Sequence, residues 1–322
     1  MVDATHHSCM SLSKPDLVYL WVDGGDRKWQ EKRHATALTH CSDKAWRFAN
    51  VEGRFRDNEE LRYSLRSLMP HLHHFNKIRI VTDDQKPHWI KDHERLEFID
   101  HADIRSNFSV PTFSSQAIEA SLLRMKWEHD VVYFNDDIFL GGAYQPSCIY
   151  DPEALQSIAY FERAEDADPL EDAAHNEAMR VSHAILASRY DLKEVPNRPL
   201  AHGPRHLIRD RLFELAEQYP QAFEQAEAEI FRFRGTPSFT VDLYARWMIA
   251  TKKARIGIVP HMMISSGEPA LDYKLIALEN TYQDLVFFCI NDTLDNVVSH
   301  PALDNIRKTL EKVFPNKSIF EQ

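Results

Sequence analysis

The chain has 322 residues, of which 43% are hydrophobic and 11% aromatic, so it can bury a full core as one large domain or two smaller ones. Its formal net charge of -11 argues against nucleic-acid binding through a general basic surface, and against recruitment to anionic lipid by positive charge.

The four cysteines form no C-x-x-C pair and no disulfide framework, which is typical of a protein in a reducing cytoplasm. The chain opens without a signal-peptide pattern and has no apolar run of membrane-spanning length. Any work at a membrane is therefore expected to be peripheral, at its inner face, or to depend on a partner.

The first predicted strand covers Leu17–Val22 and follows a polar segment, residues 1–15, that is expected to be mobile. The strand is nearly all apolar, which is typical of a strand buried on both faces of a parallel sheet. It ends in Asp23, Gly24 and Gly25, and glycines allow turns and close approaches that side chains would block. We interpret the turn as part of a binding site rather than a simple link to the next helix, because the strand looks central.

A helix is predicted to begin near Asp57, since Asp57 and Glu60 have capping-box spacing and leucines follow at helical intervals. The polar side chains around its first turn include Arg56, Asn58, Glu59 and Arg62. Helix N-termini attract anions and arginines bind phosphate bidentately, so these four residues are candidates for substrate binding. The competing interpretation is an ordinary solvated helix end, which is the more frequent case.

Two further strands, Lys77–Asp83 and Leu96–Asp100, complete a strand–helix–strand rhythm that is typical of a parallel sheet. A helix capped by Ser114 or Ser115 then carries Glu119. The fold class predicted from this rhythm is α/β, with a mostly parallel central sheet and flanking helices.

The strand Val131–Phe134 delivers Asn135, Asp136 and Asp137 to its carboxyl end. Acids at that position are a common way for an α/β sheet to build a site, and hard oxygen ligands suit Mg²⁺ or Mn²⁺ bridging to phosphates. An Asp-rich turn explains the same residues equally well, because Asn and Asp are ordinary turn residues.

The segment Leu200–His206 is a second dense polar cluster, presented by the turn that Gly203 and Pro204 force. It carries His202 and Arg205, and imidazole is the usual acid–base group near neutral pH. A site and a structural role are equally weighted here. A helix is expected to follow from near Leu207.

A late apolar strand, Leu285–Thr293, again delivers an Asn-Asp pair, Asn291 and Asp292. Because the same pair, Asn135 and Asp136, also ends an earlier strand, a metal or phosphate site is the better explanation of both Asn-Asp pairs. The metal-ligand candidates are Asp136, Asp137 and Asp292. A last amphipathic helix is predicted over Pro301–Phe314.

Taken together, these segments resemble the Stealth family of hexose-1-phosphate transferases, which includes bacterial capsule polymerases and the catalytic core of the animal N-acetylglucosamine-1-phosphotransferase. The segments that carry the resemblance are Asp16–Gly24, Arg54–Arg66, Ile80–Asp83, Pro111–Ser115, Tyr133–Asp137, His202–Pro204 and Ile290–Asp292. The resemblance implies a GT-A-like, Rossmann-type core. It also implies transfer of a sugar 1-phosphate, typically from a UDP-N-acetylhexosamine, to a saccharide hydroxyl, with release of UMP. The catalytic positions that it implies are Glu119, Asp137, His202 and Arg234, with Arg232 as the alternative to Arg234.

The resemblance also implies one catalytic domain over residues 16–322. Within it, 16–150 form the nucleotide-sugar half, 151–280 a helical insertion with the His/Arg cluster, and 281–322 a returning strand and helix. The partners expected are a nucleotide-sugar donor and a saccharide acceptor, with no nucleic acid, and association with a membrane capsule-assembly complex; the oligomeric state is open.

The mechanism that we expect places a divalent ion on Asp137, together with Asp136 or Asp292. His202 is the preferred general base, with Asp137 and Glu119 as rivals. Arg234 and Arg56 would stabilise phosphate oxygens. Two alternatives stay open: a conventional glycosyltransferase that releases UDP, and a non-catalytic carbohydrate-binding protein.

Overall fold

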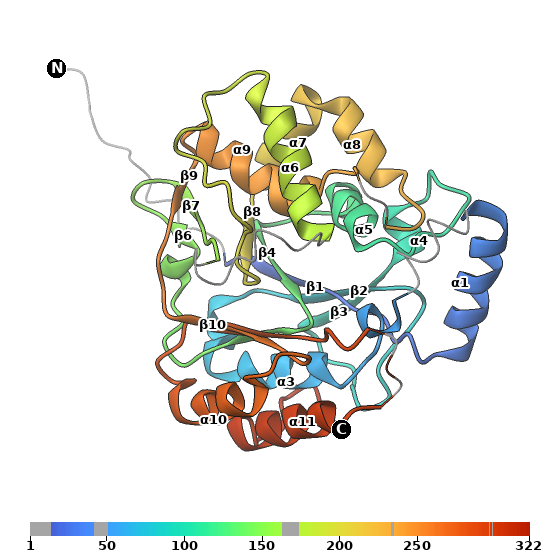
Figure 1. Ribbon diagram of the computed structural model, residues 1–322, viewed down its shortest axis with the longest axis vertical. Helices are drawn as coiled ribbons and strands as arrows, with labels where there is room; N and C mark the ends of the chain where they lie inside the picture. The colour runs from blue at the N-terminus through green and yellow to red at the C-terminus, as the bar shows by residue number, and fades with distance from the viewer. Residues whose placement is uncertain (1–13, 42–50, 163–173, 233–234, 296, 298) are drawn as a thin grey trace.

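A five-stranded sheet lies at the centre of the protein, whose computed structural model describes residues 14–41, 51–162, 174–232, 235–295, 297 and 299–322 (Figure 1). The strands lie in the order β3 (Leu96–Asp100), β2 (Ile78–Thr82), β1 (Asp16–Leu20), β4 (Val131–Asn135) and β8 (Arg205–Leu207). The first four are parallel, and β8 runs antiparallel to β4. The predicted α/β fold with a mostly parallel central sheet and flanking helices is therefore confirmed.

Both faces of the central sheet are covered, as the apolar strands predict. Alternate side chains of a strand point to opposite faces. Val18 of β1 accordingly packs in one core with the helices above the sheet, whereas Leu17 and Tyr19 pack in another with helix α3 (Glu60–Ser67). The upper helices in Figure 1 are α5 (Ser115–Ser121), α6 (Ala174–Ala187), α7 (Arg209–Gln218), α8 (Pro220–Glu227) and α9 (Tyr244–Ala250).

A second sheet is formed by β10 (His261–Ser265), β11 (Phe287–Asn291) and β5 (Ile138–Leu140), in that order. Strands β10 and β11 are parallel, and β5 runs antiparallel to β11. Its outer face packs against α10 (Leu271–Thr281) and α11 (Pro301–Val313), which lie at the bottom of Figure 1. The returning strand and the C-terminal helix thus complete this layer.

The smaller elements connect these layers. A third sheet contains β6 (Tyr150–Asp151), β7 (Gln156–Ala159) and β9 (Ala254–Ile256). Short 3-10 turns lie at Glu52–Arg54, Met69–His74, Leu122–Arg124 and Pro146–Cys148, and a π-helical turn at Phe239–Leu243 leads into α9.

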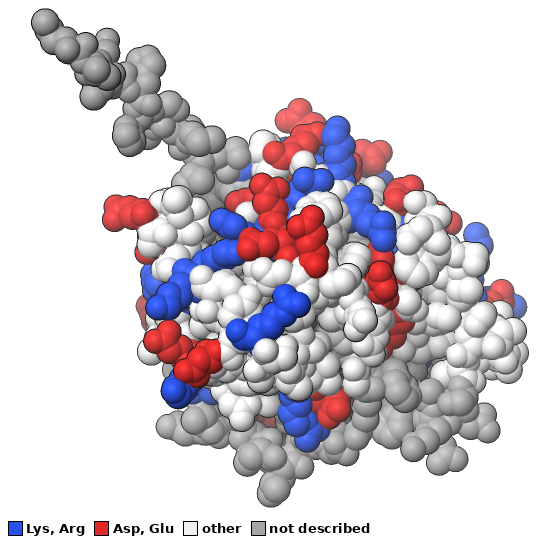
Figure 2. Space-filling view, turned by 90° about the horizontal axis from the view of Figure 1, so that it is seen from above, with Lys and Arg blue, Asp and Glu red and all other residues white. Residues whose placement is uncertain are grey.

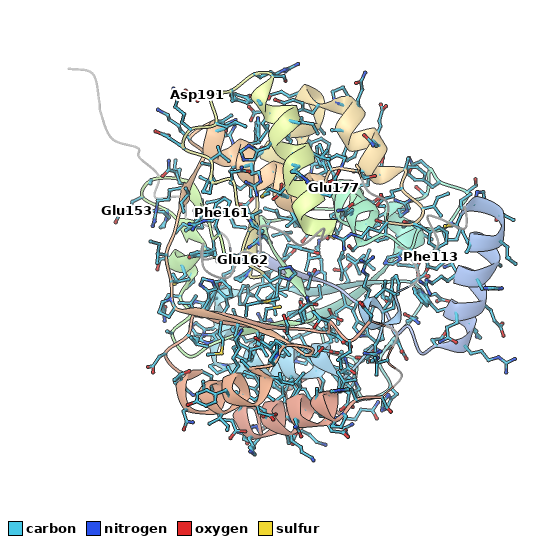
Figure 3. The ribbon with its side chains drawn as sticks, viewed as in Figure 1. Phe113, Glu153, Phe161, Glu162, Glu177 and Asp191 are labelled. Carbon is cyan, nitrogen blue, oxygen red and sulfur yellow. The ribbon has the colours of Figure 1, made fainter. Side chains whose placement is uncertain are left out.

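Helix α1 (Arg27–His40) stands at the side of the molecule and is held there by aromatic packing. Trp29 of α1 contacts Phe113, whose ring centroid lies 5.4 Å away, and Phe113 stacks on Phe231 at 5.3 Å. Figure 3 shows Phe113 on the side of the molecule next to α1. Side-chain oxygen Oδ1 of Asp26 caps the helix by accepting from the Trp29 amide.

Three local predictions differ from the structure. The helix expected near Asp57 begins at Glu60, because Asp57 and Glu60 hydrogen-bond to the backbone of the preceding turn instead of forming the capping box. The apolar residues within 255–264 also predict a single strand, but the structure has two strands there, β9 and β10, in two different sheets. Pro260 lies between them and has no N–H for a ladder. The segment 205–207, expected as the approach to a helix, is strand β8 at the edge of the central sheet.

The outer surface is electrostatically mixed on the face that Figure 2 presents. Lys and Arg side chains alternate there with Asp and Glu and with neutral residues, so the described part of this face has no continuous basic area. Of the helices in the described ranges, none combines the length and the apolar character that crossing a membrane requires.

Candidate active site

Asp136 and Asp137 form the two-residue turn that joins β4 to β5, and so lie where the central and second sheets meet. Strand β11 runs directly beside the turn: the Ile290 amide donates to the Asp137 carbonyl oxygen at 3.0 Å, and Cys289 pairs with Ile138. The sequence left two interpretations of Asn135, Asp136 and Asp137 open, an Asp-rich turn and a binding site. In the structure Asp136 and Asp137 do form a turn, and because it lies between two sheets, both acids are close to residues of β11.

The Asp137 carboxylate has one oxygen in use and one without a partner. The Cys289 thiol donates to Oδ2 at an Sγ–Oδ2 distance of 3.3 Å, whereas Oδ1 is buried and has no hydrogen-bond partner among the described residues. Burial raises the pKa of Asp137 to about 6. A buried polar atom left unsatisfied costs roughly 1–3 kcal/mol, so Oδ1 is an acceptor that a bound cation or water could satisfy.

His202 lies close to this carboxylate. One potential ligand atom each from Asp137, His202 and Cys289 lie within 4.8 Å of one another. His202 is half-buried, and Cys289 is fully buried in β11.

The loop that carries His202 is anchored to the end of β7. The Glu162 amide donates to the Pro199 carbonyl at 3.0 Å, Phe161 forms a β-bridge with Leu200, and the loop continues from there to His202. Figure 3 labels Phe161 and Glu162 in the middle of the molecule, between the upper helices and the second sheet. These backbone contacts therefore hold the start of the loop that leads to His202.

Gly203 permits the close approach of this loop to β11, and its replacement by Ala is expected to lower both activity and stability. A Cβ at Gly203 would overlap the ring of Phe287, which begins β11. Overpacking of this kind costs about 1–3 kcal/mol, which denaturant unfolding would measure, and it would displace His202 from Asp137. Gly267→Ala is the control, because its nearest neighbour would be the Thr293 hydroxyl at 3.0 Å; its stability should stay within about 1 kcal/mol of wild type. Equal losses in the two variants would contradict the role of Gly203.

Two acids on the α3 side, the buried Glu60 and the half-buried Asp57, act electrostatically on Asp136 of the turn. Burial raises the pKa of Glu60 to about 7 and that of Asp57 to about 6. The pKa of Asp136 is raised well above its ordinary value, first by burial and then by the charges of Glu60 and Asp137. Asn58 donates to both oxygens of Glu60 at 2.7 Å. These acids repel one another at a strand end and lie beside an unsatisfied carboxylate oxygen. Such a set of oxygen ligands suits a divalent cation.

Arg56 and Asp292 meet in an ion pair, although the sequence assigned them to different roles. Arg56 also donates to the Val297 carbonyl at 2.5 Å, and Asp292 accepts from the Ser266 hydroxyl at 3.1 Å. Asn58 lies 3.4 Å from Asp292, so these predicted residues do share one region. Asp292 already has a cationic partner there, and its role as a metal ligand stays a prediction.

Glu119 is buried on the other side of β4. The Tyr133 hydroxyl lies 3.2 Å from its Oε1 and 2.6 Å from Oδ1 of Asn135. Burial raises the pKa of Glu119 to about 7, against the opposing influence of Arg232, Tyr133 and Arg205. Its Oε2 atom is buried and has no hydrogen-bond partner in the described part of the chain. The predicted residues Glu119 and Asn135 thus form one polar network.

Two arginines interact electrostatically with Glu119. Burial lowers the pKa of Arg205 to about 10, and Glu119 counteracts that effect. Arg232 is near enough to influence Glu119, whereas Arg234 lies outside the described residues. The choice between Arg232 and Arg234 as the phosphate contact stays open.

Glu59 and Arg62 are engaged with the C-terminal segment. Arg62 donates to Glu321 at 2.7 Å and to Glu59 at 3.2 Å. The structure gives both residues a structural partner, and their contact with substrate stays a prediction.

The turn after β1 is held by residues that the sequence did not single out. The Gln85 side-chain amide makes two hydrogen bonds of 2.9 Å to the backbone N–H and C=O of Asp23. The Gly24 amide donates to the Phe55 carbonyl at 2.7 Å, and a Cβ on Gly24 would overlap Phe55. The Gly25 amide donates to the Asp23 carboxylate at 2.7 Å. Gly24 is therefore required by a close backbone contact.

A cavity of about 400 Å³ opens beside this turn, at the carboxyl ends of β1 and β2. It is lined by Asp23, Trp29, Asp83 and other side chains, and it also reaches Asp57 of the buried acids. Asp83 forms an ion pair with Lys32, and its buried Oδ2 has no hydrogen-bond partner among the described residues. The cavity thus offers aromatic surface and a carboxylate acceptor, and one of its lining acids, Asp57, acts electrostatically on Asp136 of the β4–β5 turn.

Sequence reasoning missed the hydrogen bonds that Cys289 and Gln85 make in the candidate site. The apolar run around Cys289 predicts a buried thiol, and the thiol is buried. Its hydrogen bond to Asp137, however, arises from strand pairing that no local pattern reveals. Gln85 follows Asp83 at a predicted strand end, and that position was the available signal.

Residues 16–41 match the family model of Stealth protein conserved region 1, and residues 54–158 match that of conserved region 2. An exopolysaccharide phosphotransferase of Streptomyces coelicolor is 30% identical over 95% of this chain and 57% of its own length. The exopolysaccharide phosphotransferase CpsY of Mycobacterium leprae is 27% identical over the same shares, 95% and 57%. The chain thus spans about half the length of the curated relatives that it matches. A solved structure of the galactosyltransferase LgtC with donor and acceptor sugar analogues is similar at a TM-score of 0.46 and 9% identity, covering 92% of this chain and 95% of that one.

Proposed function

Because this chain belongs to the Stealth proteins, we propose that it transfers a sugar 1-phosphate from a nucleotide sugar to a hydroxyl of an acceptor saccharide. The donor is a UDP-sugar, an N-acetylhexosamine derivative by preference, and the product is a phosphodiester of a capsule or exopolysaccharide. The names of the relatives, exopolysaccharide phosphotransferases, support phosphate transfer in polysaccharide synthesis. The observation that carries the proposal is the convergence of Asp137 and His202 from segments far apart in the chain.

The reaction forms one bond and breaks one bond at phosphorus. The acceptor oxygen attacks the phosphorus that carries the sugar, the bond from that phosphorus to the bridging oxygen breaks, and UMP leaves. His202 takes the acceptor proton, and a base in this position contributes typically about 10²–10⁴-fold. Asp137 and Glu119 are the alternative bases, since burial raises the pKa of both to between about 6 and about 7.

Asp137 and Asp136 are the residues that would hold Mg²⁺ or Mn²⁺. The unsatisfied Oδ1 of Asp137 and the raised pKa of Asp136 support this assignment, while Asp292 would have to give up its pairing with Arg56 to take part. When bound, such an ion would supply positive charge against the diphosphate. Arg232 or Arg234 would stabilise the phosphate oxygens.

The cavity beside the Asp23 turn is the proposed place of the donor nucleoside. Its position at the carboxyl ends of parallel strands is where open α/β sheets bind ligands, and Trp29 and Asp83 offer stacking and hydrogen-bonding partners. The cavity reaches Asp57, so a donor lying there would extend toward the acids of the β4–β5 turn. We further propose that the protein associates peripherally with a membrane-bound capsule-assembly complex.

Incubation with a panel of UDP-sugars, Mg²⁺ and a saccharide acceptor is expected to release UMP, which chromatography separates from UDP. Full activity in excess EDTA would contradict the assignment of a metal ion. Release of UDP would identify a conventional glycosyltransferase, and sugar binding without release of either nucleotide would identify a binding protein. The matched control is the Asp137→Asn protein, which should release neither nucleotide above the background.

A further inference from the structure

Three side chains of different chemical types, each of a kind that can bind a metal ion, meet in the proposed active site. Asp137 comes from the β4–β5 turn, His202 from the loop before β8, and Cys289 from β11. Within the ranges that the structure describes, they form the one group of acid, His and Cys side chains close enough to hold an ion. Cys289 has no part in the proposed transfer reaction, so its place there calls for a separate explanation.

We propose that Asp137, His202 and Cys289 bind a transition metal ion of the zinc class, and that an ion bound there blocks transfer. The inhibitory part rests on the proposed function, which assigns Asp137 and His202 to the reaction. The donor set consists of one oxygen, one imidazole nitrogen and one sulfur. Such a mixed set favours Zn²⁺ and similar ions over Mg²⁺, which prefers oxygen ligands.

The geometry leaves little to rearrange. The three ligand atoms lie within 4.8 Å of one another, whereas ligands of one tetrahedral zinc ion lie about 3.3–3.8 Å apart, so shifts of about 1 Å close the site. Cys289 lies in a paired strand and Asp137 in a turn that Ile290 holds, and the half-buried His202 is carried by the loop before β8. Three protein ligands would leave a fourth position open.

The surroundings favour a cation. Oδ1 of Asp137 is buried without a hydrogen-bond partner in the described part of the chain. The acids Asp136 and Glu162 also act electrostatically on Cys289, and Figure 3 places Glu162 in the middle of the molecule. Arg205 is a positive charge that also acts on Cys289. A bound divalent ion would therefore meet an excess of negative charge.

Binding would exchange one proton for the metal ion. The Cys289 thiol now donates its hydrogen to Asp137 Oδ2, and metal binding would replace that S–H bond by an S–metal bond with release of the proton to solvent. The His202 nitrogen that binds the ion could no longer accept a proton from the acceptor hydroxyl. Zinc occupancy would for this reason reduce transfer.

Titration with Co²⁺ as a spectroscopic substitute for Zn²⁺ tests the site without any substrate. The wild-type protein should develop the near-ultraviolet charge-transfer band of a cobalt–thiolate bond, with saturation at one ion per chain and release of one proton. Cys289→Ser should lose the band, whereas the matched control Cys148→Ser should keep it. A wild-type protein without the band, or a Cys289→Ser protein that retains it, would overturn the proposal.

A second variant covers the case in which Cys289→Ser does not fold. His202→Ala keeps the thiol and should weaken Co²⁺ binding by more than about tenfold, since even the loss of an outer-sphere partner costs ~10- to 100-fold. Unchanged affinity in His202→Ala would also overturn the site.

The inhibitory part is measured separately, as UMP release in Mg²⁺ with increasing Zn²⁺. Release should fall as the site fills, and Cys289→Ser should require at least about tenfold more Zn²⁺ for the same fractional loss. Wild-type release that persists at full occupancy would contradict inhibition. Cobalt binding without any UMP release in Mg²⁺ alone would instead reject the proposed function and leave the metal site standing.

Discussion

Asp137→Asn is expected to lower turnover by about 10³-fold or more, the largest effect of any single substitution that we predict for activity. Asn keeps the shape of the side chain but removes the charge that would hold a divalent ion beside the donor diphosphate. Metal ions contribute several kcal/mol of charge stabilisation, and ~4 kcal/mol corresponds to about three powers of ten in rate. The measurement is the steady-state rate of UMP release at saturating donor and Mg²⁺.

Asp100→Asn is the matched control, because Asp100 also stands at the carboxyl end of a strand of the central sheet. Its carboxylate caps α4 (His101–Ile104) and accepts from the Asp84 amide at 2.6 Å. This variant should turn over at the wild-type rate with a loss of stability of about 1 kcal/mol. An Asp137→Asn protein that is folded and within tenfold of the wild-type rate would remove Asp137 from catalysis.

Glu321→Gln is expected to destabilise the protein by about 3–5 kcal/mol, the typical cost of breaking a buried ion pair. The Glu321 side chain is 1% exposed and accepts from Arg66 at 2.9 Å and from Arg62 at 2.7 Å. Its loss would leave the Arg66 guanidinium, itself 3% exposed, with only the exposed Glu311 as an acidic partner among the described residues. Denaturant unfolding of both proteins at pH 7 measures the difference.

The pH dependence of this difference has a definite sign. Burial alone would raise the pKa of Glu321, but hydrogen bonds from Arg66 and Arg62 outweigh it and lower the pKa to about 2. The carboxylate therefore stabilises the folded state above the pKa of an unfolded Glu, about 4.3, and this stabilisation is lost as the pH falls toward 2. The gap between wild type and Glu321→Gln should shrink over that window.

Asp304→Asn provides the matched control for the ion pair. Asp304 pairs with Arg307 on the exposed side of α11, where the side chains are 63% and 56% exposed. Such pairs contribute about 0.2–1 kcal/mol, so this variant should unfold almost like the wild type at every pH. Similar losses in the two variants would refute the structural role assigned to Glu321.

The long strands of the central sheet were predictable from local pattern, whereas the short ones were not. Strands β1, β2 and β4 are buried on both faces, so nearly every side chain in them must be apolar and the run is visible in the sequence. Strands β5 and β8 have three residues each. They are strands only because β11 and β4 lie beside them, and a run of that length carries no period of its own.

The candidate site shows the same division. That acids stand at strand ends was readable from the sequence, but the partner that each one meets was not. Arg62 pairs with Glu321, which lies 259 residues later in the sequence, and Arg56 pairs with Asp292, which lies 236 residues later. Both arginines were predicted to bind substrate on local grounds, and the structure gives each an acidic partner from the far end of the chain.

The sequence by itself determined the α/β class, the family resemblance, and the presence of an acid-rich end on the strand that leads to Asp137. Only the tertiary structure decided that Cys289 and His202 lie beside that acid. Whether a residue in a strand or helix is buried limits which side chain it can have, so the spacing of apolar residues along the sequence indicates which faces are buried. Which polar groups meet depends on how β11 pairs with β5 and on how the His202 loop packs on Phe287, and both contacts join segments that are far apart in the chain.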